Sequence, residues 1–176
     1  MNSRSATGTG VEAIEVSSAK QLNDEFDSLS PNLRGTDIDW SKRMKAMKKL
    51  QGLILGGATE LENFHSLFKP VAFDLSGQLI DLRSQIVREA CNTISLLAEM
   101  DPHTFEQFAT TFVSQTGLLK LISSATKVMA ACGHKCLLSI LTHVHTLKVI
   151  PKIVEEIKNR NTQVRLYISE CILTIL

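Results

Sequence analysis

The sequence predicts an all-α fold built as a solenoid of about four helical hairpins, and three observations lead to this prediction. The chain has 176 residues, of which 44% are hydrophobic, so it can bury a core of its own. Its composition favours helices, and no segment of convincing length alternates apolar and polar residues as a strand would. Finally, an apolar helical pattern recurs about every 40 residues along the chain.

The chain divides into a polar start and one repetitive domain. Residues 1–12 are rich in Ser, Thr and Gly, and we expect them to form a disordered leader. Residues 13–176 are expected to form the domain. Its four hairpins have these approximate bounds: 13–58, 60–100, 102–144 and 146–176.

The first hairpin shows the clearest helix signals. Its first helix has one apolar stripe, with spacings of four and three residues, formed by Leu22, Phe26 and Leu29. Pro31 and Gly35 then interrupt the pattern. Asp39 is placed to accept amide hydrogens at the start of the next helix, which begins in DWSKRMKAMKK and stops at the glycines at 56 and 57.

The three later hairpins follow the same plan. ELENFHSLFKPVAFDLSGQLI predicts one helix, bent near Pro70, and DLRSQIVREACNTISLLAEM predicts its partner. PHTFEQFATTFVSQTGLLKLIS predicts a single helix that pairs with ATKVMAACGHKCLLSILTHV. LKVIPKIVEEIK and TQVRLYISECILTIL form the last pair.

The second helix of each hairpin carries the same apolar face, at offsets 0, 4, 7 and 11 from an anchor residue. The four faces are Ala46, Leu50, Leu53 and Gly57; Val87, Cys91, Ile94 and Ala98; Met129, Gly133, Cys136 and Ile140; and Val164, Ile168, Cys171 and Ile175. A single hairpin is too small to bury such a face, so stacked neighbours must share a core, which is typical of HEAT and armadillo solenoids. The alternative is a bundle whose amphipathic helices match by coincidence. We also expect Arg88 and Arg165, which follow two anchors, to bond across repeats.

Charge, cysteines and hydropathy limit the possible partners and location. Residues 40–176 hold sixteen basic and eleven acidic side chains, an excess that suits an acidic protein surface better than nucleic acid. The four cysteines lie inside apolar helical patterns and read as reduced, buried thiols: Cys91, Cys132, Cys136 and Cys171. No signal peptide or membrane span is recognisable, so we expect a cytoplasmic protein with no membrane partner.

Metal, catalytic and nucleic-acid sites are not predicted. CGHKC at 132–136 could suggest zinc, but on a helix His134 points away from the face shared by Cys132 and Cys136. The sequence has no phosphate-binding loop, nucleophile elbow or paired carboxylates, so we expect no enzyme, no catalytic residue and no cofactor. The basic run at 42–49 has no interleaved aromatic residues, so we expect no nucleic acid as a partner.

Trp40 poses the main functional question. It is the only tryptophan, and five basic residues follow it within ten positions. A tryptophan at this place can be a core anchor, a contact packed onto its own repeat, a nucleic-acid stacker or the centre of a protein interface.

The chain resembles the TOG domain of CLASP-type microtubule regulators. The resemblance covers residues 37–176 and lies in WSKRMKAMKKLQGLILGGA, LIDLRSQIVREACNTISLLA and SSATKVMAACG, with DLRSQIVREAC the most specific segment. It implies a paddle-shaped HEAT array that is not an enzyme and that binds the tubulin heterodimer or the microtubule lattice along one thin edge. It further implies a place on microtubules, including spindle and plus ends, where such domains suppress catastrophe and promote rescue. The family's domain has six repeats, so we expect this chain to be a partial TOG domain, with flanking regions that contact other proteins.

The resemblance also implies the residues of the binding edge. Trp40, in the first loop, corresponds to the tryptophan that packs on tubulin, and the loop residues before each second helix are expected to form a basic ribbon beside it. The predicted tubulin-binding residues are Trp40, Lys42, Arg43, Arg83, Ser84, Lys127, Lys158, Arg160 and Asn161. Lys45, Lys48 and Lys49 are expected to be an ordinary solvated face. The alternative function is a general HEAT or armadillo scaffold that binds a peptide or partner protein in its concave face.

Overall fold

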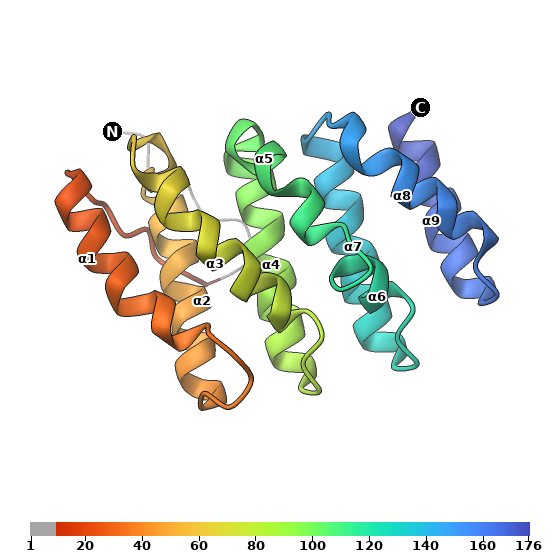
Figure 1. Cartoon of the computed structure of the whole chain (residues 1–176), viewed down its shortest axis with the longest axis horizontal. Coiled ribbons are helices and arrows are strands. Elements are labelled where there is room, and N and C mark those ends of the chain that lie inside the picture. The colour runs from red at the N-terminus through yellow and green to blue at the C-terminus, as the bar shows by residue number, and fades with distance from the viewer. Residues whose placement is uncertain (1–9) are drawn as a thin grey trace.

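The computed structural model describes residues 10–176 and confirms an all-α solenoid (Figure 1). These residues form nine α-helices and no strand. The helices pair into four hairpins that stand side by side along the long axis (Figure 1). The first helices of the hairpins form one layer and the second helices, α2, α4, α7 and α9, form the other, so the matched helices stack as repeats and not as a coincidental bundle.

The second helix of the first hairpin has the caps that the sequence predicts, and the first helix has a cap that was not predicted. Helix α1 (Ala19–Leu29) begins after Ser18, whose hydroxyl accepts a hydrogen bond from a backbone amide of the first turn. Helix α2 (Trp40–Leu55) begins after Asp39, whose carboxylate accepts from two backbone amides of the first turn. The helix ends at the predicted glycines, where Gly57 has φ of 83°, a conformation that favours glycine.

The later hairpins are less regular than expected. Their helices are α3 (Phe64–Gln78), α4 (Ser84–Met100), α5 (Pro102–Phe112), α6 (Leu118–Ile122), α7 (Lys127–His143), α8 (Ile150–Glu155) and α9 (Thr162–Ile175). The prediction of one helix before α7 was wrong, because the chain folds tightly at Gly117, where an added Cβ would lie 2.5 Å from the Phe112 carbonyl oxygen. Helix α8 is a short α-helix flanked by 3₁₀ turns at Leu147–Val149 and Glu156–Lys158.

The core follows the predicted apolar faces. Every residue of the four faces is buried except the last position of the first and of the fourth, Gly57 and Ile175, which are half-buried. One continuous hydrophobic cluster extends from Leu22 in α1 to Cys171 in α9. This shared core is what fixes the hairpins, and therefore their loops, relative to one another.

The chain before α1 packs on the second layer. Residues 1–9, which belong to the predicted leader, lie outside the described part of the chain, and residues 10–17 have no regular secondary structure. This segment crosses behind α2 (Figure 1), where the Ile14 amide donates to the Gly52 carbonyl at 2.8 Å. A Cβ at Gly52 would lie 2.8 Å from the Ile14 side chain, and one at Gly56 would overlap the Ile14 carbonyl oxygen. The two glycines therefore make room for the segment.

Candidate functional site

The loops inside the four hairpins lie along one edge of the solenoid (Figure 1). They precede the starts of α2, α4, α7 and α9, and each brings a predicted site residue to that edge. Trp40, Ser84 and Lys127 are the first residues of their helices, and Asn161 caps α9 by accepting a hydrogen bond from the Gln163 amide. The stacking of the repeats thus converts loops that are about 40 residues apart in sequence into one continuous row.

Trp40 is exposed at one end of this edge. The residue is 46% exposed, which excludes the core-anchor interpretation. Asp39 beside it is also exposed, and hydrogen bonds from the Ser41 side chain and backbone amide lower the pKa of its carboxyl. Because Asp39 holds the start of α2, the indole has a fixed backbone position although its surface is open to solvent.

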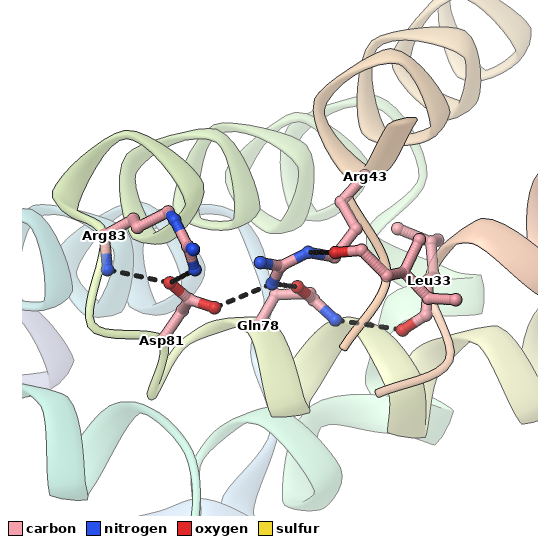
Figure 2. A network of polar contacts seen from close by, with 6 residues as sticks. Leu33, Arg43, Gln78, Asp81 and Arg83 are labelled. Carbon is pink, nitrogen blue, oxygen red and sulfur yellow. Dashed lines mark hydrogen bonds and ion pairs between the residues drawn. The ribbon is translucent and has the colours of Figure 1, made fainter. Parts of the chain in front are cut away.

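Arg43 does not belong to the exposed ribbon, and this part of the site prediction was wrong. Its exposed fraction is 0%, and its guanidinium is directed into the molecule between the first two hairpins (Figure 2). Nη1 donates to Gln78 Oε1 and to Asp81 Oδ2, each at 2.7 Å, and Nε donates to the Ile38 carbonyl at 3.1 Å. The sequence held a signal for this burial, because Arg43 lies three positions before Ala46 and so on the apolar face of its helix.

The Arg43 contacts tie the first intra-hairpin loop to the second. Gln78 donates to the Leu33 carbonyl at 2.9 Å, and the other oxygen of Asp81 accepts from the Arg83 amide at 2.7 Å (Figure 2). Burial opposes ionisation of Asp81, but the hydrogen bonds from Arg43 and Arg83 outweigh it and lower the pKa of its carboxyl. A charged Asp81 therefore fixes Arg83, whose own side chain stays exposed, at a set place relative to Trp40.

The remaining predicted residues are accessible along the edge. Ser84 is half-buried, and five others are exposed: Lys42, Lys127, Lys158, Arg160 and Asn161. The edge therefore carries an exposed cation in, or directly after, each of its four loops.

Sequence reasoning missed the exposed apolar residues of this edge. Leu82 is 96% exposed between Asp81 and Arg83, and Ile80 and Val128 are also exposed. The available signal was that Leu82 falls in a loop, outside the helical stripes. Apolar side chains in this place add contact area that a purely basic ribbon lacks.

The edge is notched between neighbouring loops. A hollow of about 290 Å³ separates the third and fourth loops, and Lys127, Asn161 and Tyr167 are among the residues that line it. A second hollow, of about 380 Å³, lies between the second and third loops and includes Leu82 and Lys120. Such notches can accept side chains of a bound protein surface.

The two arginines expected to bond across repeats do not do so. Arg165 donates to the carbonyls of Asn159 and Arg160 at 2.8 and 3.1 Å, both within its own hairpin. Arg88 is exposed and makes no hydrogen bond or ion pair to residues 10–176. Arg43 makes such a cross-repeat bond instead, because it lies on the inner face of α2 and reaches Asp81 of the next hairpin.

Within residues 10–176, no three His, Cys, Asp or Glu side chains gather closely enough to hold a metal ion. None of the helices in that range has the length and apolar character needed to cross a membrane.

Comparison with known proteins relates the chain to one family. Residues 22–176 match the sequence model described as CLASP N terminal. The chain is 36% identical over 156 residues to the CLIP-associated protein of Arabidopsis thaliana, covering 88% of this chain and 11% of the relative. It is 31% identical over 154 residues to CLIP-associating protein 1-B of Xenopus laevis, covering 86% and 10%. The chain thus spans about a tenth of the length of these relatives.

Proposed function

The chain belongs to the CLASP N-terminal family, and on that premise we propose that it is a microtubule-associated module that binds tubulin along the edge formed by its four intra-hairpin loops. The observation that carries the proposal is the position of Trp40. The indole is exposed at the start of α2, at one end of a row of loops that also carry cations. A rigid aromatic side chain on an open edge is typical of a protein-interface hot spot.

Apolar and charged groups of the edge contribute to binding in different ways. Trp40, with Leu82 and Ile80 in the next loop, supplies area that loses water on contact. The exposed cations speed the encounter with an acidic surface and orient it, although each one contributes less than ~1 kcal/mol. We therefore expect the affinity to fall as salt concentration rises, with a residual part that depends on Trp40.

The proposed effect on microtubules follows from binding at an edge. A module that holds tubulin at a growing or shrinking end stabilises the polymer there, which is the basis for expecting rescue and suppression of catastrophe. Binding to free heterodimers and binding to the lattice are both compatible with the same row of loops.

The experiment measures association with purified tubulin at two salt concentrations, by size-exclusion chromatography and by co-sedimentation with microtubules. Trp40→Ala should weaken binding by ~2 kcal/mol, about 30-fold, because the hot-spot area is lost. The matched control is Phe73→Ala, since Phe73 is also an exposed aromatic residue but lies in α3, away from the loops.

Folding must be checked separately from binding. Trp40→Ala should melt near the temperature of the unsubstituted protein, because an indole exposed to this degree leaves little cavity. If that variant fails to fold, Leu82→Ser tests the same edge at a side chain that is 96% exposed. Unchanged tubulin binding by folded Trp40→Ala and Leu82→Ser variants would remove the proposal.

A further inference from the structure

The layer formed by α2, α4, α7 and α9 has three valleys between neighbouring helices, and the same sequence position faces each of them. This position follows the second residue of the apolar face by one. It is occupied by Gln51 in α2, Asn92 in α4 and His134 in α7. Since the repeats superpose in register, these three side chains should play equivalent parts.

The first valley is filled by Gln51. This residue is fully buried, and its Nε2 donates to Glu89 Oε1 at 2.6 Å and to Thr93 Oγ1 at 2.9 Å, both in α4. The amide therefore spans the distance between α2 and α4. No ligand-sized space is left at this point, because Gln51 itself occupies it.

The third valley is filled in a different way. His134 is buried and stacks on Tyr167 of α9, with ring centroids 4.1 Å apart and an angle of 17° between the planes. Its Nε2 also lies 3.1 Å from a carboxylate oxygen of Glu170. The two aromatic rings close the space between α7 and α9.

The middle valley is hollow. Asn92 is exposed and makes no hydrogen bond to residues 10–176. Where α4 offers Glu89 to Gln51, the equivalent position of α7 is Ala131, which is too short to reach across. The result is a groove of about 460 Å³ between α4 and α7, within the range of ~300–1,000 Å³ usual for ligand sites.

The lining of this groove is positive and partly apolar. Arg88 on α4 and Lys135 on α7 are both exposed and contribute to it, and no carboxylate is among its lining residues. Val128 and Ala131 provide apolar surface. Asn92 offers both a donor and an acceptor, the combination that a peptide unit requires.

We propose that the groove between α4 and α7 binds an extended, acidic segment of a partner protein. Carboxylates two or more residues apart would pair with Arg88 and Lys135, a backbone peptide unit would bond Asn92, and a small apolar side chain would lie on Ala131. The molecule already accepts such a segment on the same layer, because residues 11–16, VEAIEV, lie across α2 through the Ile14–Gly52 hydrogen bond. This site is separate from the tubulin-binding edge, so the two functions can coexist.

The test uses a fluorescein-labelled eight-residue peptide in which glutamate alternates with valine, and a matched peptide with lysine in place of glutamate. Fluorescence anisotropy with the full chain should show saturable binding of the acidic peptide and none of the basic one. Cys132 lies in the groove and is partly exposed, whereas the other three cysteines are buried. The acidic peptide should therefore slow the alkylation of Cys132 by N-ethylmaleimide, as read by peptide mass spectrometry.

Variants locate the bound peptide. Arg88→Glu with Lys135→Glu should weaken binding at least tenfold, whereas Lys45→Glu with Lys48→Glu, which changes net charge equally on α2, should leave it within twofold. Asn92→Gln with Ala131→Glu installs the pair that fills the first valley and should abolish binding while the chain stays folded. Trp40→Ala should bind the peptide as the unsubstituted chain does.

Any one of four results with the peptides and variants would overturn the proposal. These are equal binding of the basic peptide, an equal loss in the two charge-reversal variants, unchanged alkylation of Cys132, or a loss in Trp40→Ala that matches the loss in the groove variants. Self-association of the chain that the acidic peptide does not compete with would assign the groove to a second copy and would likewise overturn it.

Discussion

The two ends of the loop edge are held by different kinds of interaction. At the first end, Arg43 and Asp81 form a buried ion pair, with side chains 0% and 2% exposed, that joins the first two loops. At the other end, Glu156 is also buried, but it accepts hydrogen bonds from the exposed Gln115 and the half-buried Asn159. The first arrangement joins two charges away from water, whereas the second joins one carboxylate to neutral amides close to water.

The two ends should therefore depend to different degrees on a single side chain. A buried charge that loses its partner keeps the full cost of its desolvation, so the first end should fail as a unit. An exposed or half-buried amide that loses its acceptor can bond water instead, so the second end should depend less on a single side chain. The molecule has a separate reporter for each end, because its single tryptophan, Trp40, lies at the first and its single tyrosine, Tyr167, at the last.

The strongest test of the comparison is Arg43→Met. The substitution removes the buried cation of Asp81 and leaves only the exposed Arg83 beside it, and we expect the free energy of unfolding to fall by about 3–5 kcal/mol, as for other broken buried pairs. Urea unfolding followed by Trp40 fluorescence measures this change. The neighbouring exposed cation provides the control, because Lys42→Met should stay within about 0.5 kcal/mol.

A second substitution separates the cost of the unpaired Asp81 charge from the cost of the lost Arg43 packing. Adding Asp81→Leu to Arg43→Met removes the unpaired charge and should recover a large part of the loss. A single Arg43→Met variant that loses less than about 1 kcal/mol would show that the first end does not depend on this ion pair.

At the other end, Glu156→Leu should have a smaller effect. It leaves the amide groups of Gln115 and Asn159 without their acceptor, and we expect a loss of about 1–3 kcal/mol. Unfolding followed by Tyr167 fluorescence reports this change. Glu155→Leu is the matched control, since Glu155 precedes it in the chain but is exposed. An equal loss in the two variants would mean that the hydrogen bonds of Glu156 to Gln115 and Asn159 do not contribute to stability.

As the pH falls, the stabilisation of the last hairpin by His134 should be lost before the Arg43–Asp81 ion pair that joins the first two loops. Burial lowers the pKa of His134, an effect that the nearby Glu170 carboxylate only partly offsets. The unfolded chain therefore binds a proton at His134 more readily than the folded chain, so the contribution of this residue is present above about pH 6.5 and declines as the pH falls through and below that value.

Asp81 behaves in the same sense, but at lower pH. Its carboxyl has a lowered pKa when folded, so the ion pair stays intact through the range in which His134 titrates and is lost only in stronger acid. Stability measured between pH 7 and 5 should decline in the unsubstituted chain and decline less in His134→Gln. His145→Gln, at an exposed histidine, should keep the original profile; if it flattened the profile as much as His134→Gln does, His134 would not be the group responsible.

The smallest expected effect on stability concerns the edge cations themselves. Lys127→Ala should change the free energy of unfolding by no more than about 0.5 kcal/mol, because the side chain is exposed at the start of α7. Its effect on tubulin binding should stay below ~1 kcal/mol and should shrink at high salt. A salt-independent loss in co-sedimentation would contradict the assignment of Lys127 to the charged part of the edge.

Periodicity allowed the fold to be predicted, because each second helix repeats the same four apolar positions and stacking is the only way to bury them. The helix caps could also be predicted. Asp39 has a side chain that accepts hydrogen bonds from backbone amides, and Gly57 is the residue type that favours a positive φ. The break at Gly117 was missed because it depends on a close approach to the Phe112 carbonyl, which periodicity does not report.

The site was less predictable than the fold. The sequence placed Trp40 and the loop cations before their helices, and stacking brought them to one edge. Arg43 was misassigned because the basic run around it was given more weight than its place on the apolar face, and because its partner Asp81 is 38 positions away. The groove at Asn92 exists because the short Ala131 side chain of α7 lies opposite. Which residues lie opposite one another is known only from the packed helices.

Gly56, the residue that follows α2, has space for nothing larger than a hydrogen atom on its α-carbon. A methyl group there would collide with the Ile14 carbonyl oxygen while leaving the inward side of the helix unchanged. Gly56→Ala should therefore detach residues 10–17 from α2 without melting the solenoid, and a protease should then cut ahead of α1 first. One methyl group would thus release residues 10–17 from α2 and expose the surface of the helix that these residues now cover.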